Sequence, residues 1–127
     1  MDEVSLRPYR EYHARREREL RDQREALRLR VLEQAREAIR GSAPKFPAIR
    51  AVYLFGSVLQ SGRFRPDSDV DVAIDSEALE VETPFWRLLE GALERNVDLR
   101  PRVGPIARAV EDHGELCYER EVPDSGT

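Results

Sequence analysis

The chain has 127 residues and a formal net charge of −4, with 40% apolar and 36% charged residues. This length fits one domain, and the negative charge gives no general attraction to nucleic acid, so a nucleic-acid partner is not expected. The single cysteine, Cys117, excludes an intramolecular disulfide, and the only histidines, His13 and His113, form no zinc motif. No apolar run is long enough to span a bilayer and no signal-peptide pattern is present, so we expect a cytoplasmic protein.

The first predicted element is a long helix from Tyr9 to Arg40. This stretch contains no Gly or Pro and is dense in Arg, Glu, Leu and Ala, which predicts a helix roughly 45 Å long at about 1.5 Å per residue. Pro8 suits its start and Gly41 its end. We therefore treat residues 1–41 as one unit, a charged N-terminal helix.

The two halves of this helix differ. The second half carries a narrow, mostly apolar stripe that should pack on a sheet, formed by Leu27, Val31, Gln34, Ala35 and Ala38. The first half has few apolar residues, and opposite charges such as Glu17 and Arg21 can pair one turn apart. It is therefore either a solvated helix or an arm that meets a partner through the side bearing Tyr9, Tyr12 and Leu20.

After a linker, Ser42 to Pro47, an apolar run from Ile49 to Phe55 predicts the first strand. It stops abruptly at Gly56-Ser57, where a loop to Ser68 begins. Glycine lets the backbone turn sharply and approach a ligand closely. Free N–H groups at a helix start after such a turn can hold a phosphate.

The second strand carries two carboxylates, Asp69 and Asp71, at alternate positions. Residues two apart in a strand point to the same face, so the carboxylates should project together while Val70, Val72 and Ile74 face the core. Two adjacent like charges repel, and a divalent cation with oxygen ligands is the usual way to neutralise them. A phosphate-binding turn facing such a pair suggests a nucleoside triphosphate held through magnesium.

The combination of Gly56-Ser57, an eleven-residue spacer and Asp69-Val70-Asp71-Val72 resembles the signature of the DNA polymerase β-type nucleotidyltransferases. The lead-in Pro66-Asp67-Ser68-Asp69 is similar to their small prokaryotic branch, the minimal nucleotidyltransferases, often encoded beside HEPN-domain toxins. Many minimal members have Gly-Ser-x-x-x-Gly, whereas Gly62 comes one residue later here. The resemblance covers roughly residues 44 to 120.

A helix follows, with Thr83 as the expected N-cap, Pro84 as the first helical residue and Asn96 at its close. It has the densest apolar face in the chain, and we expect Trp86 to lie in the core. The face is formed by Phe85, Trp86, Leu88, Leu89, Ala92 and Leu93. The short third strand, Val97 to Leu99, places Asp98 between apolar neighbours. If this strand pairs beside the second, Asp98 lies near Asp69 and Asp71; otherwise it is a surface residue of an edge strand.

The remainder reads as a loop from Pro101 to Pro105, a short helix from Ile106 to His113 ending at Gly114, and an edge strand over Leu116 to Tyr118. Together these elements predict an α/β domain of the mixed, α+β type. Its core, residues 42–122, would be a small nucleotidyltransferase-like mixed β-sheet with helices mainly on one face. Residues 123–127 would be a tail.

The resemblance implies transfer of a nucleoside monophosphate, AMP from ATP, with release of pyrophosphate. Asp69 and Asp71 would hold Mg²⁺ or Mn²⁺, and Asp98 would ligate one ion or take a proton. Gly56 and Ser57 would position the β and γ phosphates.

The rest of the loop adds further candidates for nucleotide binding. Arg63, Arg65 and Ser68 are the ones we select. The arginines could steady the triphosphate tail or a carboxylate of the site, or could serve solubility alone.

The resemblance also implies a protein acceptor, such as a HEPN toxin, and hence an antitoxin in a toxin–antitoxin system. Two alternatives stay open. One is a non-catalytic binding module that masks its partner by contact, and the other is a transferase acting on a small molecule or an RNA end.

Overall fold

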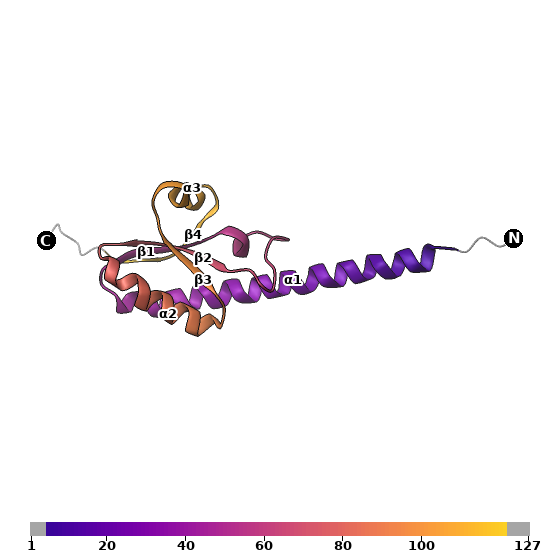
Figure 1. Cartoon of the computed structure of the whole chain (residues 1–127), viewed down its shortest axis with the longest axis horizontal. Coiled ribbons are helices and arrows are strands. Elements are labelled where there is room, and N and C mark those ends of the chain that lie inside the picture. The colour runs from indigo at the N-terminus through magenta and orange to yellow at the C-terminus, as the bar shows by residue number, and fades with distance from the viewer. Residues whose placement is uncertain (1–4, 122–127) are drawn as a thin grey trace.

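Four strands form one mixed sheet in the order β3-β2-β1-β4 (Figure 1). In the computed structural model, which describes residues 5–121, the strands are β1 (Ile49–Phe55), β2 (Val70–Ser76), β3 (Val97–Pro101) and β4 (Glu115–Glu119). β1 is antiparallel to β2 and to β4, whereas β2 and β3 are parallel and are joined through a helix. The predicted small mixed sheet with a helical crossover is therefore confirmed.

Helices cover both faces of this sheet. α1 (Arg7–Ser42) and α2 (Glu82–Leu93) lie on one face and the shorter α3 (Gly104–His113) lies on the other (Figure 1). Alternation along the central strand explains this division, because successive side chains point to opposite faces. Val52 and Leu54 join the main core under α1 and α2, while Tyr53 and Phe55 pack with Val110 of α3.

The second strand follows the predicted alternation. Val70, Val72 and Ile74 are almost fully buried in the main core. Asp71 therefore points to the opposite face, the one that carries α3. Fully burying an aliphatic side chain of this size contributes about 1.5–3 kcal/mol relative to leaving it exposed, so these three residues oppose a one-residue slip of the strand.

The long helix differs from its prediction at its end. It continues through Gly41 to Ser42 and leads directly into a 3-10 turn, Ala43–Lys45. The chain becomes extended only at Phe46, so the prediction of Gly41 as the stop was wrong. Ala43 is fully buried, and this burial favours the continued helical path over a glycine cap.

The packed stripe of α1 also differs from its prediction in part. Its buried residues are Val31, Leu32, Ala35, Ile39 and Ser42, with Leu27 and Ala38 partly buried against the core. Gln34 is exposed. Burial thus follows the i, i+4 row of Val31, Ala35 and Ile39 rather than the row that includes the glutamine.

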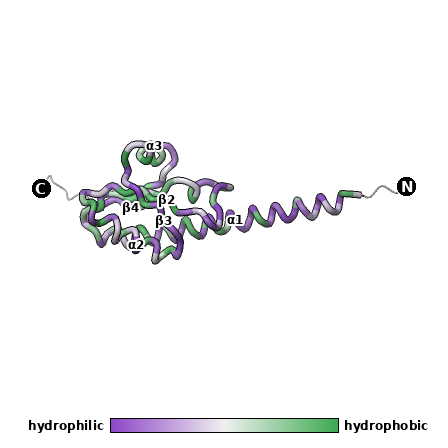
Figure 2. Tube along the Cα trace, viewed as in Figure 1, coloured by the Kyte–Doolittle hydropathy of each residue, from purple (hydrophilic) through white to green (hydrophobic). Residues whose placement is uncertain are grey.

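Every residue of α1 before Glu25 is exposed to solvent. Figure 1 shows this part of the helix extending beyond the rest of the molecule, and Figure 2 shows it as mostly hydrophilic. We call Arg7–Arg24 the arm and the remaining described chain from residue 43 onward the head. At 36 residues α1 is about 54 Å long.

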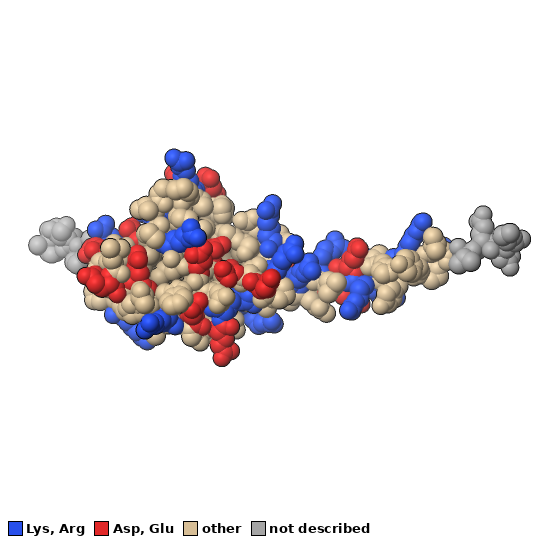
Figure 3. All heavy atoms as spheres, in the orientation of Figure 1, with Lys and Arg blue, Asp and Glu red and all other residues tan. Residues whose placement is uncertain are grey.

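Charge is distributed unequally between these parts (Figure 3). Residues 7–30 contain nine arginines and five acidic residues, whereas residues 43–121 contain ten basic and fifteen acidic residues. The arm and the turns beside it are therefore net positive, and the head is net negative.

The bounds of the two shorter helices also differ from the predicted ones. α2 begins at Glu82, so Thr83 lies inside the helix and is not its N-cap, and it ends at Leu93 with Glu94 in the left-handed region (φ 49°) rather than at Asn96. Leu79–Val81 form a 3-10 turn that runs directly into α2, which explains the earlier start. Pro101 belongs to β3, while Gly104 and Pro105 belong to α3.

Trp86 packs against the core as predicted and Cys117 lies within it. Leu88 and Ala92 of the apolar face of α2 are exposed. Trp86 Nε1 donates a hydrogen bond to the carbonyl of Val97 at 2.8 Å, which ties α2 to the start of β3. The thiol of Cys117 is buried, and burial raises its pKa to about 12, so it stays protonated.

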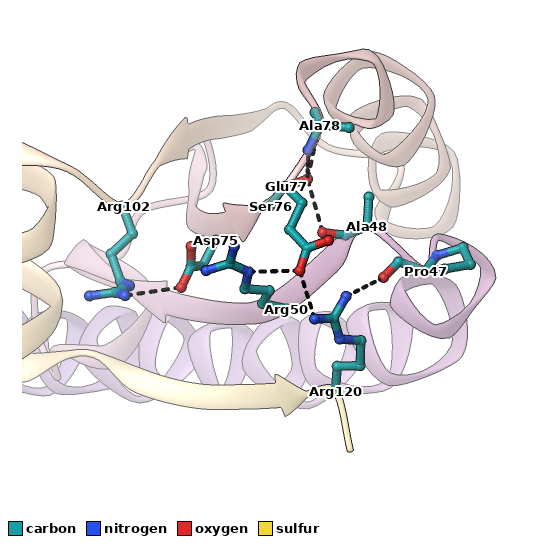
Figure 4. Close-up of polar contacts among 9 residues, drawn as sticks. All are labelled: Pro47, Ala48, Arg50, Asp75, Ser76, Glu77, Ala78, Arg102 and Arg120. Atoms are coloured by element: carbon teal, nitrogen blue, oxygen red, sulfur yellow. Dashed lines mark hydrogen bonds and ion pairs between the residues drawn. The ribbon is translucent and has the colours of Figure 1, made fainter. Parts of the chain in front are cut away.

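Ion pairs close the end of the sheet where β1 begins and β2 and β4 end (Figure 4). Glu77 accepts hydrogen bonds from Arg50 (3.1 Å) and from Arg120 (2.8 Å), and Arg120 also donates to the carbonyl of Pro47 at 2.7 Å. Nearby, Arg102 donates to Asp75 at 3.0 Å. Asp75 and Glu77 at this end are thus paired with arginines.

No helix in the described part, residues 5–121, is long and apolar enough to cross a membrane. The predicted tail, 123–127, lies outside the described residues.

Candidate active site

The predicted site residues meet at the end of the sheet where β1 finishes and where β2 and β3 begin. Strand pairing places Phe55 opposite Asp71 and Asp71 beside Asp98. Asp69 comes immediately before β2. The structure thus brings the three predicted aspartates to one sheet edge from two neighbouring parallel strands.

The turn after β1 lies directly against Asp71. Gly56 has φ +77° and starts a four-residue 3-10 turn, Gly56–Leu59. A methyl group on Gly56 would overlap Oδ2 of Asp71 and lie 3.0 Å from its Cγ. Glycine is therefore required twice at this position, for its backbone conformation and for the close approach to the carboxylate.

Without a cation, the ionised form of Asp71 is destabilised in this site. Burial, together with the neighbouring charges of Asp98 and Asp69, raises the pKa of Asp71 to about 6, while Arg100 acts in the opposite direction. Burial is the largest of these causes, as expected for a half-buried carboxylate without a bonded partner of its own. A positive charge placed here would stabilise the ionised form.

Arg100 lies beside the candidate site and was not among the predicted site residues. Its Nε donates to Asp98 Oδ1 at 3.0 Å, and both side chains lie on the same face of β3, two residues apart. The alternation of β3 was a usable signal for this pair, because residues i and i+2 of a strand share a face.

The donor set suits a hard divalent cation, since carboxylate oxygens are the ligands that Mg²⁺ and Mn²⁺ prefer. Among the described residues, however, no group of three or more acidic, histidine or cysteine side chains is arranged closely enough to hold a metal. Arg100 bonds one oxygen of Asp98, Oδ1. The carboxylates of Asp69, Asp71 and Asp98 therefore suit a cation by chemistry and charge, and binding one would require them to move closer together.

The predicted loop residues fall into two groups. Ser68 Oγ accepts a hydrogen bond from the Arg65 amide at 2.8 Å, and the Ser68 amide donates to the Arg65 carbonyl at 3.0 Å. Ser68 thus stabilises the turn that leads into β2. Arg63 and Arg65 are exposed, and within residues 5–121 neither side chain forms a hydrogen bond or ion pair.

Arg95 holds this loop in place, although no sequence pattern predicts this role. Its NH1 donates to the carbonyls of Pro66 and Ser68, both at 2.8 Å, and its guanidinium lies 5.0 Å from the ring centre of buried Phe64. Arg95 follows α2 by two residues and is far from the loop in sequence. Long side chains that bond distant carbonyls leave no periodic pattern.

Two open hollows flank the aspartates. One, of about 340 Å³, has Asp69 in its lining, together with Pro66, Asp67, Ser68, Glu94, Arg95 and Asn96. The other, of about 330 Å³, has Asp98 in its lining, together with Glu82, Thr83, Trp86, Val97 and Leu99. A ligand in either hollow would lie next to a carboxylate of the site.

A family model described as "Polymerase beta, Nucleotidyltransferase" matches residues 37–121. Among curated proteins, none is significantly similar in sequence.

Solved structures do match. A toxin–antitoxin crystallised with AMP-PNP is 24% identical with a TM-score of 0.52, over 71% of this chain and 74% of that chain. A mutant of the toxin–antitoxin MntA-HpeT is 23% identical with a TM-score of 0.50, over 67% and 70%. An MNT antitoxin in complex with the tri-AMPylated HEPN toxin of Shewanella oneidensis is 21% identical with a TM-score of 0.49, over 71% and 73%. At these identities the first two establish the likeness of the fold.

Proposed function

Because the chain belongs to the polymerase beta nucleotidyltransferase family, we propose that it transfers a nucleoside monophosphate, AMP from ATP, to a side chain of a partner protein. The observation that carries this proposal is the convergence of Asp69, Asp71 and Asp98 beside the turn at Gly56. A sheet edge with three carboxylates and a close glycine turn suits a metal-bound triphosphate better than any apolar ligand.

The reaction would displace pyrophosphate from the α phosphorus. A hydroxyl oxygen of the acceptor forms a bond to that phosphorus, the bond from the α phosphorus to the bridging oxygen breaks, and the hydroxyl proton passes to a base. A bound divalent cation supplies charge neutralisation of the phosphates and lowers the pKa of the acceptor hydroxyl. Asp69 and Asp71 would hold it.

The remaining residues would have distinct tasks. Asp98 would complete the ligand set or accept the proton, after exchanging its bond to Arg100. The amides of the turn at Gly56 and Ser57 would hold phosphate oxygens, because Gly56 lies directly against the carboxylate of Asp71. Arg63, Arg65 and Ser68 border the same loop and would contribute charge or shape toward the triphosphate.

The comparisons support ATP and a protein acceptor. One matching structure is a toxin–antitoxin with AMP-PNP, an analogue of ATP, and another is the toxin–antitoxin MntA-HpeT. Together with the HEPN association implied by the sequence motif, these favour a HEPN-type toxin as the acceptor of this chain and an antitoxin role for the chain.

The arm is the proposed docking surface for that acceptor. Tyr9 and Tyr12 are 64% and 54% exposed, and His13 contacts both rings, at centroid distances of 4.3 and 5.4 Å. Exposed aromatic side chains held by one another are typical interface anchors. Figure 1 shows the arm extending from the side of the head on which the loop after β1 meets α1, so a protein bound along it would lie beside this loop.

The test combines the chain with a HEPN toxin, ATP and Mg²⁺ and measures the intact mass of the toxin. We expect one or more AMP increments with the wild-type chain, none with Asp69→Asn, and unchanged transfer with Asp112→Asn, which alters an exposed carboxylate of α3.

Two results would replace the proposal. Neutralisation of the toxin without added mass, and equally well by Asp69→Asn, would make the chain a masking protein. Release of pyrophosphate with AMP found on a small molecule or an RNA end, and none on protein, would assign a different acceptor.

A further inference from the structure

Two residues of α1 that follow the arm, Glu25 and Arg28, are hydrogen-bonded to the loop of the site. Arg28 NH1 donates to the carbonyl of Val58 at 3.1 Å, and Arg28 Nε donates to both carboxylate oxygens of Glu25, at 3.2 and 3.1 Å. Glu25 Oε2 in turn accepts a hydrogen bond from Ser61 Oγ at 3.0 Å. The pair therefore binds the loop after β1 at two points, three residues apart.

This pair differs from the ion pairs of the arm itself. Arg7–Glu11 and Arg16–Glu19 are solvent-exposed pairs within one helix, the latter at 3.9 Å. The Arg28 side chain, by contrast, is only 11% exposed. Exposed pairs stabilise little, whereas a largely buried guanidinium with several partners fixes the geometry of the groups that it bonds.

The two attachment points bracket the end of the 3-10 turn, Gly56–Leu59. Val58 is fully buried and follows Ser57 directly. At the other end of the turn, Gln60 Nε2 donates to the carbonyl of Gly56 at 3.3 Å. Asp71 blocks movement of the Gly56 turn toward the sheet, so the turn can move only away from it. The hydrogen bonds from Arg28 and Glu25 oppose this outward movement.

The side chains beside this junction come from the arm as well as from the loop. A hollow of about 510 Å³ is lined by Arg21, Asp22, Arg24 and Glu25 of α1 and by Ser61, Gly62 and Phe64 of the loop. The loop is thus hydrogen-bonded to α1 directly after the arm. A displacement of α1 at Glu25 and Arg28 would move the loop through these hydrogen bonds.

We propose that Glu25 and Arg28 are positioning residues that hold the Gly56–Leu59 turn in the conformation that receives the triphosphate. The assignment of the triphosphate to this turn rests on the proposed function, whereas the restraint on the turn does not.

The experiment compares wild-type protein with Arg28→Ala, Arg28→Lys, Glu25→Gln and Ser61→Ala, with Arg16→Ala as the matched control on the arm. Amide hydrogen exchange at residues 57–61 is measured without nucleotide, and the dissociation constant of AMP-PNP is measured with Mg²⁺. Thermal melting reports whether each variant is folded.

Arg28→Ala should raise exchange at these amides at least tenfold and weaken AMP-PNP binding by a similar factor, while the turnover number at saturating nucleotide stays within about threefold. Arg28→Lys should restore only part of either effect, because an ammonium cannot bond a carboxylate bidentately and a carbonyl in one plane. Glu25→Gln and Ser61→Ala should have smaller effects in the same direction, and Arg16→Ala none.

Unchanged exchange at residues 57–61 in both Arg28→Ala and Glu25→Gln would overturn the positioning role. If the wild-type chain binds no AMP-PNP with Mg²⁺ or Mn²⁺, the proposed function fails. Faster exchange confined to residues 57–61 would then still support the restraint by Glu25 and Arg28.

Discussion

Gly56 and Asp71 lie against each other at one end of the sheet: a methyl group on Gly56 would overlap Oδ2 of Asp71, so a residue with a side chain does not fit at position 56. Gly56 directly follows β1, and Asp71 lies in β2, with Phe55 opposite Asp71 in the register of this antiparallel pair. The turn and the carboxylate are thus one structural unit, and a change in either alters the other.

Gly56→Ala should destabilise the protein and abolish nucleotide binding, because the methyl group displaces either the turn or Asp71. Gly62→Ala is the matched control for backbone strain, since Gly62 also has a positive φ (+81°) but has open space around it. That variant should cost only the left-handed conformation, about 1–2 kcal/mol. Urea unfolding measures both. Equal losses in the two variants would contradict the contact with Asp71.

Metal-free protein should become more stable as the pH falls from about 7 to about 5. The folded pKa of Asp71, about 6, lies above its ordinary value of 3.8, so its ionised form destabilises the fold above pH 6 and this penalty disappears on protonation. Glu25, Glu77 and Glu115 have lowered pKa values, so the stability that they contribute is lost only at lower pH.

Melting temperatures measured across this pH range in chelator test the effect. Asp71→Asn should flatten the profile between pH 7 and 5 and leave the loss of stability at lower pH unchanged. A wild-type profile that is already flat would contradict the raised pKa of Asp71.

ATP should bind only with Mg²⁺ or Mn²⁺, because three carboxylates and a triphosphate cannot share one sheet edge without a cation. Calorimetric titration should show weak or no binding in excess chelator. Asp69→Asn should raise the melting temperature of the metal-free protein slightly, since one repulsive charge is gone, and should weaken binding in the presence of metal. Equal ATP affinity with and without metal would exclude the cation site.

Asp98 should matter more to the reaction than to binding, since its carboxylate is held by Arg100 in the metal-free protein. Asp98→Asn should keep ATP affinity within a few-fold and lower the transfer rate by about 10²–10⁴, the loss expected for a general base. Single-turnover transfer to the acceptor separates the two quantities. Wild-type turnover would make Asp98 an ordinary surface residue of β3.

Removing residues 1–20 should weaken partner binding while leaving metal-dependent ATP binding intact, because this deletion takes Tyr9, Tyr12 and Leu20 but ends before Glu25. Tyr9→Ser combined with Tyr12→Ser should reproduce most of the loss, and Arg16→Ala should not. Affinity for the partner is measured by titration of the purified proteins. Full partner affinity after truncation would place the docking surface on the head.

The sequence allowed accurate prediction where one local signal decided the structure. The strand Ile49–Phe55 was predicted to the residue, because an apolar run there meets a linker on one side and Gly56 on the other. The alternation of Val70, Val72 and Ile74 likewise predicted which face of β2 carries Asp71.

Predictions failed where two local signals competed. Gly41 and Thr83 are good helix-end residues, yet buried Ala43 and the 3-10 turn before Glu82 extended both helices past them.

Arg28 and Arg95 could not have been selected, because each acts on a carbonyl some thirty residues away, Val58 and Pro66 respectively. Such hydrogen bonds depend on how the helices, strands and loops pack, and no local sequence pattern predicts them.

The separation of a net positive arm from a net negative head gives the molecule an electric dipole along its long axis. A charged protein approaching within a few Debye lengths, each about 8 Å at physiological salt, would be rotated before contact. An acidic surface would meet the arm first and would be repelled by the aspartate edge until cations neutralise it. The molecule would thereby orient its partner during approach, and rising ionic strength would slow association while leaving the short-range contacts of the complex largely unchanged.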